Sequence, residues 1–218
     1  MDQKILRLMG FMTIVLLLTA SPALAESGAF SIGAMGGWAW NIADYAVEGS
    51  FTEYPKTEFK SGAAYGGSIM YRFPRGFALE LCAEHLSMKL KELGNDFGKL
   101  NMTPLMLLLK FQGRPQKGTG FTGHFDIGGG INFTSFDKGS FVTGLEEATG
   151  VKFDIKTDKS FVFEVGGGVD YFFTKNISTN LDVRFLGTNV GTSGWKVDVD
   201  KFYASNFQIL LGLRYWFN

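Results

Sequence analysis

The chain has 218 residues, with 21 basic and 21 acidic side chains and a mean hydropathy of +0.07. A net charge near zero gives no electrostatic basis for nucleic-acid binding, and the single Cys82 excludes an intramolecular disulfide. Beyond the N-terminal apolar stretch, no segment holds a run of apolar residues long enough for a spanning helix, so any membrane-spanning part of the remainder has to be a closed β-barrel.

The N-terminus has the pattern of a bacterial export signal. Two basic residues precede an apolar run at residues 8–20, and residues 22–25 (PALA) provide a small-x-small cleavage site. The apolar run is shorter than the roughly 20 residues that a spanning helix needs. We therefore predict a cleaved signal peptide at residues 1–25 and one barrel domain at residues 26–218. An uncleaved N-terminal anchor is the alternative.

Eight stretches of the remaining chain alternate between apolar and other residues with a period of two, which is the pattern of a β-strand with one apolar face. They cover residues 28–40, 61–73, 77–88, 100–111, 121–136, 160–173, 177–187 and 207–217. Most have the roughly 9–11 residues that a transmembrane strand requires. The last stretch is the clearest, because its apolar face ends in Tyr215 and Phe217, which we expect to serve as the barrel-assembly signal.

The connections between these stretches alternate in length. Residues 74–76 and 174–176 form short turns and residues 112–120 a medium one, whereas residues 41–60, 89–99, 137–159 and 188–201 are expected to form long polar loops. Aromatic residues gather beside the short turns, as in the interfacial girdle of a membrane barrel. We predict an all-β fold, a transmembrane eight-stranded antiparallel up-and-down β-barrel in the cell outer membrane, with the long loops outside the cell. A soluble β-barrel or sandwich with a phenylalanine core is the alternative.

Charged residues fall on the positions that face the lumen in this barrel. They are Arg72, Glu80, Glu84, Lys110, His124, Asp126, Glu164, Asp170, Asp182, Arg184 and Arg214. Unpaired charges in a narrow interior are costly, so we expect an ion-pair network in the periplasmic half of the lumen. Because an eight-stranded barrel is only wide enough for its own side chains, we expect this network to plug the floor.

Above this floor, the inward positions are mainly apolar. They comprise Met35, Leu86, Met88, Met102, Met106, Leu108 and Val162. Inward glycines lie beside them, so this region is either a flexible recess for an apolar solute or simply the filling of the barrel.

Several strands resemble the OmpW family of small outer-membrane barrels. The resemblance lies in residues 69–73 (IMYRF) with 77–81 (FALEL), residues 103–111 (TPLMLLLKF), residues 125–134 (FDIGGGINFT), and residues 167–172 (GGVDYF) with 180–184 (NLDVR). The region around Trp38 and the terminal Asn218 depart from the family pattern. The resemblance implies a narrow channel for small hydrophobic molecules, and folding that depends on the barrel-assembly machinery.

Three functions are compatible with these observations. The first is a channel for small hydrophobic molecules. The second is a non-transporting barrel whose long loops bind host, phage or lipopolysaccharide. The third is an outer-wall enzyme of the lipid A deacylase type, since His85 and Ser87 share a strand face; however, the adjacent Glu84 faces the other way, so no triad is evident and we expect no enzyme. We also expect no cofactor or metal and no nucleic-acid partner, and contacts with outer-membrane lipid and lipopolysaccharide.

Overall fold

The structure is a computed structural model that describes residues 28–42, 58–74, 76–92, 95–113, 118–150, 152, 156–157, 159–190, 192–193 and 202–217. The predicted signal peptide at residues 1–25 lies outside this part of the chain, as do most of the predicted loops at residues 41–60 and 188–201. Among the described residues, no helix has the length and hydropathy needed to cross a bilayer.

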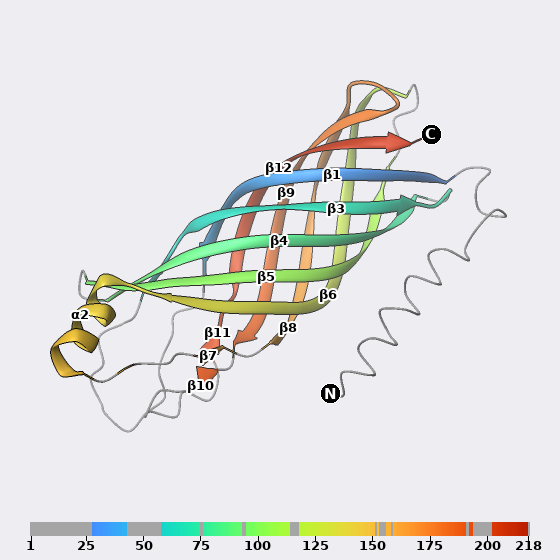
Figure 1. Ribbon diagram of the computed structural model, residues 1–218. Coiled ribbons are helices and arrows are strands. Elements are labelled where there is room, and N and C mark those ends of the chain that lie inside the picture. The colour runs from blue at the N-terminus through green and yellow to red at the C-terminus, as the bar shows by residue number, and fades with distance from the viewer. Residues whose placement is uncertain are drawn as a thin grey trace.

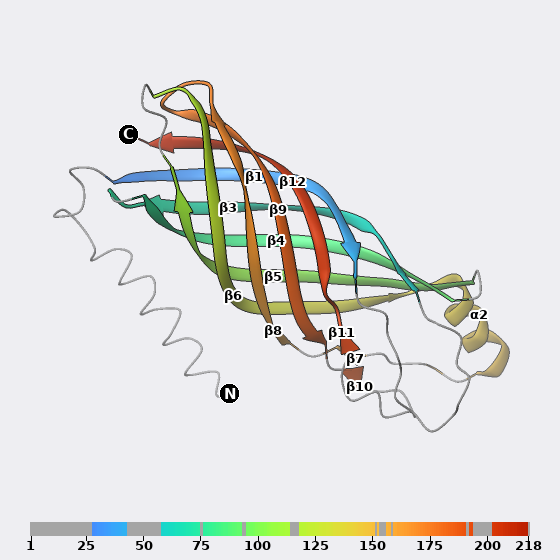
Figure 2. The ribbon, with the colours of Figure 1, turned by 180° about the vertical axis from the view of Figure 1, so that it is seen from behind.

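Eight long antiparallel strands close into a barrel. These strands are β1 (Ala29–Asn41), β3 (Gly62–Arg72), β4 (Phe77–Glu92), β5 (Asn95–Gln112), β6 (Gly120–Lys138), β8 (Ser160–Phe172), β9 (Ile177–Val190) and β12 (Asn206–Phe217). Each pairs with its neighbour along the chain, and the first, β1, also pairs with the last, β12. β1 and β12 therefore lie side by side in both views of the ribbon (Figures 1 and 2). The predicted up-and-down barrel is confirmed.

Side chains alternate strictly between lumen and outer wall. In β12 every second residue from Asn206 to Trp216 is buried, and every residue between them is exposed. The exposed side chains are apolar along the middle of the barrel and aromatic near the short turns, where Phe73 and Phe77 stack at 4.4 Å between ring centroids. An apolar, lipid-facing outer wall around a more polar interior is the arrangement of a transmembrane barrel, so the faces predicted from the sequence are confirmed.

The short turns at one end of the barrel are as predicted. In the turn after β3, the Phe73 amide donates to the Phe77 carbonyl at 2.8 Å, and Gly76 has a positive φ of 85° that favours glycine. In the turn after β8, the Phe173 amide donates to the Ile177 carbonyl at 3.0 Å. Both turns lie at the end of the barrel where β12 finishes, which is the periplasmic end in proteins of this architecture (Figure 1).

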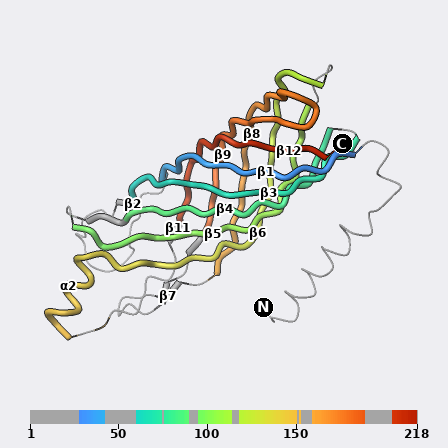
Figure 3. The backbone as a smooth tube through the Cα atoms, turned by 45° about the horizontal axis from the view of Figure 1, so that its top comes forward, coloured from blue at the N-terminus to red at the C-terminus, as the bar shows by residue number. Residues whose placement is uncertain are grey.

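The predicted long loop at residues 89–99 is wrong. β4 continues to Glu92 and β5 begins at Asn95, so the two strands form a long hairpin, with a register shift at Leu90/Lys91. The short strand β2 (Glu58–Lys60) adds to the same extension by pairing with β4, as the tube trace shows beside β4 and β5 (Figure 3). Outward positions of the extension carry Lys89 and Lys99, because it projects beyond the lipid-facing band, and this composition resembles that of a loop.

The predicted loop at residues 137–159 contains a helix, α2 (Ser140–Thr149), that the sequence did not reveal. Gly150 ends it in the left-handed conformation, with φ 68°, and its amide donates to the Glu146 carbonyl at 2.9 Å. Phe141 packs on Phe97 of β5, with 4.7 Å between ring centroids, which holds the helix beyond the end of the hairpin (Figure 1). The helix was not predicted because its sequence, SFVTGLEEAT, is short and contains a glycine, so the helical alternation of apolar and polar residues is weak.

Three further short strands lie at this same end of the molecule. β7 (Lys156–Thr157) pairs with β10 (Thr192–Ser193), and β11 (Phe202–Tyr203) pairs with β9. Together with α2 they mark the extracellular end, opposite the short turns (Figure 2).

Inward glycines allow the wall to bend. At Gly130 of β6 an added Cβ would lie 1.9 Å from the Leu105 carbonyl oxygen, and at Gly37 of β1 it would lie 1.9 Å from that of Ile209. Only glycine permits backbones to approach so closely at these positions. The mid-strand glycine runs therefore belong to the curvature of a narrow barrel.

Candidate functional site

The lumen is filled by three stacked layers of side chains, and the lowest is aromatic. Trp216 is fully buried at the periplasmic end, where its indole Nε1 donates to the Ser178 hydroxyl at 2.9 Å. The guanidinium of Arg72 lies over this indole, 4.1 Å from the ring centroid, and 5.8 Å from the ring of Phe172. This aromatic floor was not predicted, although the inward parity of Trp216 could have suggested it.

The middle layer is charged, and one of its centres is Glu80 of β4. Lys110 lies 3.2 Å from Glu80 Oε2 and 3.5 Å from Asp126 Oδ2. Arg214 of β12 forms an ion pair with the other oxygen of Glu80, and it also donates to the hydroxyls of Ser31 and Ser68 at 3.2 Å each. Cations from two separate strands thus converge on one buried carboxylate.

The second centre of the charged layer is Arg184 of β9. Its guanidinium donates to Glu84 of β4 and to Asp182, both at 2.7 Å, and lies 3.4 Å from Glu164 of β8. Because Arg184 and Glu84 come from opposite walls of the barrel, this contact crosses the lumen. All of these side chains are almost completely buried.

His124 of β6 links the remaining carboxylates. Its Nδ1 lies 2.7 Å from Asp170 and its Nε2 lies 2.9 Å from Asp182, while Asp126 lies 3.7 Å away. Both contacts are satisfied together when both ring nitrogens carry a proton. The Gln112 side chain donates to the same Asp170 at 2.9 Å.

The structure thus brings most of the predicted charged residues together in one continuous layer. Its members are Glu80, Glu84, Lys110, His124, Asp126, Glu164, Asp170, Asp182, Arg184 and Arg214. The guanidinium of Arg72 lies over Trp216 in the aromatic floor below, where β3 ends; its membership of the ion-pair network stays a prediction.

The upper layer contains the predicted apolar residues. Leu86, Met88, Met102, Met106 and Leu108 are fully buried, and Met35 is 8% exposed. They pack in one cluster with Val162, Leu186 and Leu210. In this structure the cluster is closed, so the predicted recess exists only as a set of mutually packed, flexible side chains.

Beyond the apolar cluster, towards the extracellular end, the inner wall is polar, which was not predicted. Gln208 donates to Asn206 at 2.9 Å, and the hydroxyls of Ser160 and Thr188 lie 2.9 Å apart. Asn132 lies beside them, 3.4 Å from Ser160. These residues occupy inward positions at the extracellular ends of β6, β8, β9 and β12, so the period of two in the sequence indicates that they face the lumen.

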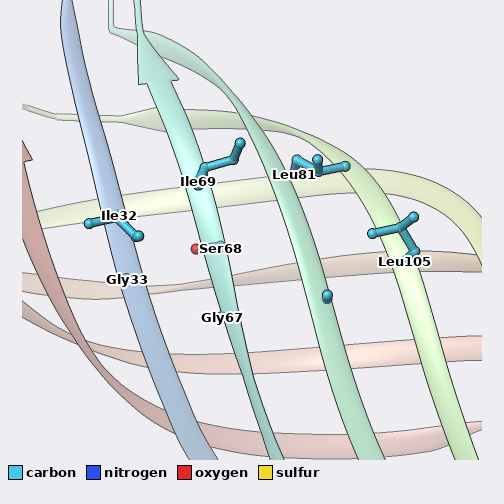
Figure 4. A pocket seen from close by; sticks show the side chains of 8 residues that line it. Ile32, Gly33, Gly67, Ser68, Ile69, Leu81 and Leu105 are labelled. Carbon is cyan, nitrogen blue, oxygen red and sulfur yellow. The ribbon is translucent and has the colours of Figure 1, made fainter. Parts of the chain in front are cut away.

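Two shallow grooves indent the outer wall. One, of about 420 Å³, is lined by the small residues Ala34, Gly36 and Gly212 and reaches Met35 of the apolar cluster. The other, of about 340 Å³, lies across β1, β3, β4 and β5 (Figure 4). Both lie within the lipid-facing band.

The remaining predicted residues lie on the outer wall or at its ends. Tyr215 and Phe217 are exposed, with an edge-on contact of 4.9 Å between their rings; their role as an assembly signal stays a prediction. His85 faces outward and contacts the Thr103 hydroxyl at 3.2 Å, whereas Glu84 is held by Arg184 inside the lumen.

A closed eight-stranded barrel with an apolar outer band, aromatic ends and a charged interior defines an integral outer-membrane protein. The model of the family described as outer membrane protein beta-barrel domain matches residues 11–215. The chain belongs to this family and is a protein of the outer membrane, as the resemblance to small outer-membrane barrels predicts. No curated protein sequence matches the chain significantly.

Solved structures of other outer-membrane proteins share the fold. OprG from Pseudomonas aeruginosa is 21% identical, with a TM-score of 0.58 over 88% of this chain and 97% of OprG. Neisserial surface protein A is 15% identical, with a TM-score of 0.54 over 86% and 97%. The outer membrane protein W of E. coli also matches, at 15% identity and a TM-score of 0.45 over 88% and 99%.

Proposed function

We propose that the barrel is a passage that takes small hydrophobic molecules into its upper lumen and releases them sideways into the membrane. One observation carries this proposal: the apolar cluster stands on a sealed charged layer, yet reaches the outer wall at Met35. The OmpW-like pattern of the sequence points to the same class of solute.

The charged layer blocks a straight path for a hydrophobic molecule from the upper lumen to the periplasm. A hydrophobic molecule moving downward would have to separate Arg184 from Glu84 and Lys110 from Glu80, all of them buried. Removing one partner from a buried ion pair costs roughly 3–5 kcal/mol, and an apolar solute offers no replacement contact. The aromatic floor formed by Trp216 and Arg72 adds a second barrier.

A sideways path leaves the charged layer intact. Met35 lies between the apolar cluster and the wall groove, and the neighbouring Gly36 and Gly212 leave the wall thin there. Methionine has three rotatable bonds and adapts its shape readily, so a rotation of Met35 together with a local separation of β1 from β12 would connect lumen and lipid. The polar wall around Gln208 would then hold the hydrophilic end of an amphipathic solute.

Filling the groove tests this route. At Gly36 an added Cβ meets nothing closer than 3.9 Å, so Gly36→Leu occupies the groove without disturbing the backbone. We expect uptake of a radiolabelled medium-chain alkane by cells that express this variant to fall to the level of cells without the barrel. Gly123→Leu, on the outer wall of β6, adds the same bulk away from the groove and serves as the control, since an added Cβ there also meets nothing closer than 3.9 Å. Unchanged uptake with Gly36→Leu would contradict the sideways route.

A non-transporting surface barrel is the second candidate. The described part of the extracellular end includes α2, which leaves Phe141 and Leu145 about 40% exposed, a composition suited to contact with another surface. Replacing residues 140–149 by a short glycine–serine linker would abolish binding to such a partner while leaving alkane uptake intact. We assign no catalytic role, because Glu84 faces the lumen and cannot orient the outward His85.

A further inference from the structure

Three lysines form a row on the outer wall at the extracellular end. Lys60 of β2 pairs directly with Lys89 of β4, and Lys89 pairs with Lys99 of β5. All three side chains are exposed. Directly opposed side chains on neighbouring strands lie about 5 Å apart, and like charges in this arrangement repel one another. The row therefore carries an energetic cost that an anionic ligand would remove.

The protein itself neutralises this row only in part. Within the part of the chain that the structure describes, no carboxylate forms an ion pair with Lys60, Lys89 or Lys99. Asp137 stands opposite Lys99 in the register and offsets part of its charge, while its carboxylate accepts a hydrogen bond from Asn101 at 2.8 Å; no carboxylate stands opposite Lys60 or Lys89 in the described pairings. The positive charge of the row is thus turned towards the surroundings of the barrel.

A band of hydrogen-bonding side chains lies directly below the lysine row, on the same outer face. Ser87 and Asn101 stand opposite each other in the register, two residues below Lys89 and Lys99. Two residues further, His85 and the hydroxyl of Thr103 are in contact at 3.2 Å, and the ring of Tyr65 lies 5.2 Å from that of His85. Such groups are unusual on a lipid-facing wall, where unsatisfied polar groups are costly.

Below this band, the second wall groove begins. Figure 4 shows Ile32, Ile69, Leu81 and Leu105, from four adjacent strands, around a floor where Gly33 and Gly67 leave space. Leu105 is six residues from Lys99 along β5, or about 20 Å at the usual rise of a strand. The outer face thus changes from cationic to hydrogen-bonding to apolar and grooved within the outer leaflet.

We propose that this face binds the lipid A part of lipopolysaccharide. Lipid A presents the same three chemistries in the same order: phosphates at the membrane surface, glucosamine sugars with amide and hydroxyl groups below them, and acyl chains in the leaflet. The phosphate meets the lysine row, the sugars meet the polar band, and one acyl chain lies in the groove. Beside this face, where β1 meets β12, the outward positions near the same end are aromatic, with Trp40 and Phe207 6.5 Å apart between ring centroids, so the lysine row does not continue there.

Native mass spectrometry of the barrel purified from outer membranes tests this site, with lipid A, dephosphorylated lipid A and phosphatidylglycerol as probes. We expect the triple variant Lys60→Gln, Lys89→Gln, Lys99→Gln to bind lipid A about a hundredfold more weakly, at roughly fivefold per lysine. Dephosphorylation should weaken binding to the wild type similarly and have little further effect on the triple variant. Ala83→Leu, which fills the groove, should weaken binding about fivefold.

The controls are Lys152→Gln, an exposed loop lysine, and Val183→Leu, which adds bulk outside the groove. Heat-modifiable migration on gels establishes that each variant is folded, and the single variant Lys89→Gln replaces the triple one if that fails to fold. Wild-type affinity in the lysine variants would overturn the proposal. Phosphatidylglycerol binding as tightly, with the same dependence on the lysines, would also overturn it, since the row would then be a general anionic lipid contact.

Discussion

Arg184 donates a hydrogen bond to Glu84 across the lumen at 2.7 Å, although the two residues are 100 positions apart in the chain. One stands on β9 and the other on β4, so this contact ties opposite walls of the barrel together. Arg184 also holds Asp182 and Glu164, which makes it the cation on which three buried carboxylates depend. The charged layer is therefore both a plug and a structural cross-brace.

Replacing Arg184 by methionine keeps an unbranched, flexible side chain but removes the charge. We expect the free energy of unfolding to fall by about 3–5 kcal/mol, because three carboxylates lose their shared cation in a buried site. Urea unfolding of the barrel in lipid bilayers, followed by gel migration, measures this loss. Lys138→Gln is the matched control, since its ion pair with Glu146 is partly exposed and typically worth less than about 1 kcal/mol. Equal effects of the two substitutions would show that the layer does not brace the barrel.

The faces of the strands could be predicted from the sequence, because one apolar face with a period of two is imposed by the lipid outside the barrel. The same rule placed Glu80, Lys110 and Arg184 inside correctly. Their partners could not be read from the sequence, because the tilt and stagger of the strands decide which inward residues share a level. For the same reason, the position of the Arg72 guanidinium over Trp216 could not be predicted from the sequence.

The extracellular end was predicted less well. The rule of an apolar outer face applies only where lipid is present, so it failed for the extension of β4 and β5, where Lys89 and Lys99 face outward from a strand. The helix α2 lies outside the membrane band altogether, and nothing in the barrel pattern requires it. These are also the places where the proposed lipid site and the alternative surface role lie.

The tryptophans provide a test of the barrel faces. Trp38 and Trp40 are 46% and 39% exposed on the outer wall, whereas Trp216 is fully buried in the floor. In variants that retain one tryptophan each, we expect brominated acyl chains to quench the fluorescence of Trp38 and Trp40 strongly and that of Trp216 weakly. Acrylamide added to the aqueous phase should also leave Trp216 largely unquenched, because Arg72 and Phe172 cover it. Strong quenching of Trp216 by the lipid would mean that Trp216 faces the membrane and that the lumen and lipid faces of β12 are exchanged.

The close backbone approach at Gly130 predicts a large effect from a single methyl group. Gly130→Ala puts a Cβ 1.9 Å from the Leu105 carbonyl oxygen, so β5 and β6 have to separate. We expect a loss of roughly 1–3 kcal/mol in the free energy of unfolding, as for other overpacked sites. Gly123→Ala on the same strand is the control, since its nearest neighbour is 3.9 Å away, and it should be neutral or slightly stabilising. A destabilised control with an unaffected Gly130→Ala would contradict the predicted curvature.

The two lower layers together predict how the barrel behaves in a planar bilayer. With Arg184 bonded to Glu84 across the lumen and Trp216 beneath them, no continuous aqueous path runs through the described interior, and we expect little or no steady ion conductance from the wild type. Replacing both partners, Glu84→Ala with Arg184→Ala, removes the cross-brace and leaves neither member of this pair as an unpaired charge. The remaining carboxylates line the freed space and attract water. We expect this double variant to show discrete, cation-selective openings, provided that gel migration confirms a folded barrel. Large conductance from the wild type would mean that the charged layer is not a seal, and release of hydrophobic molecules towards the periplasm would then have to replace the sideways route.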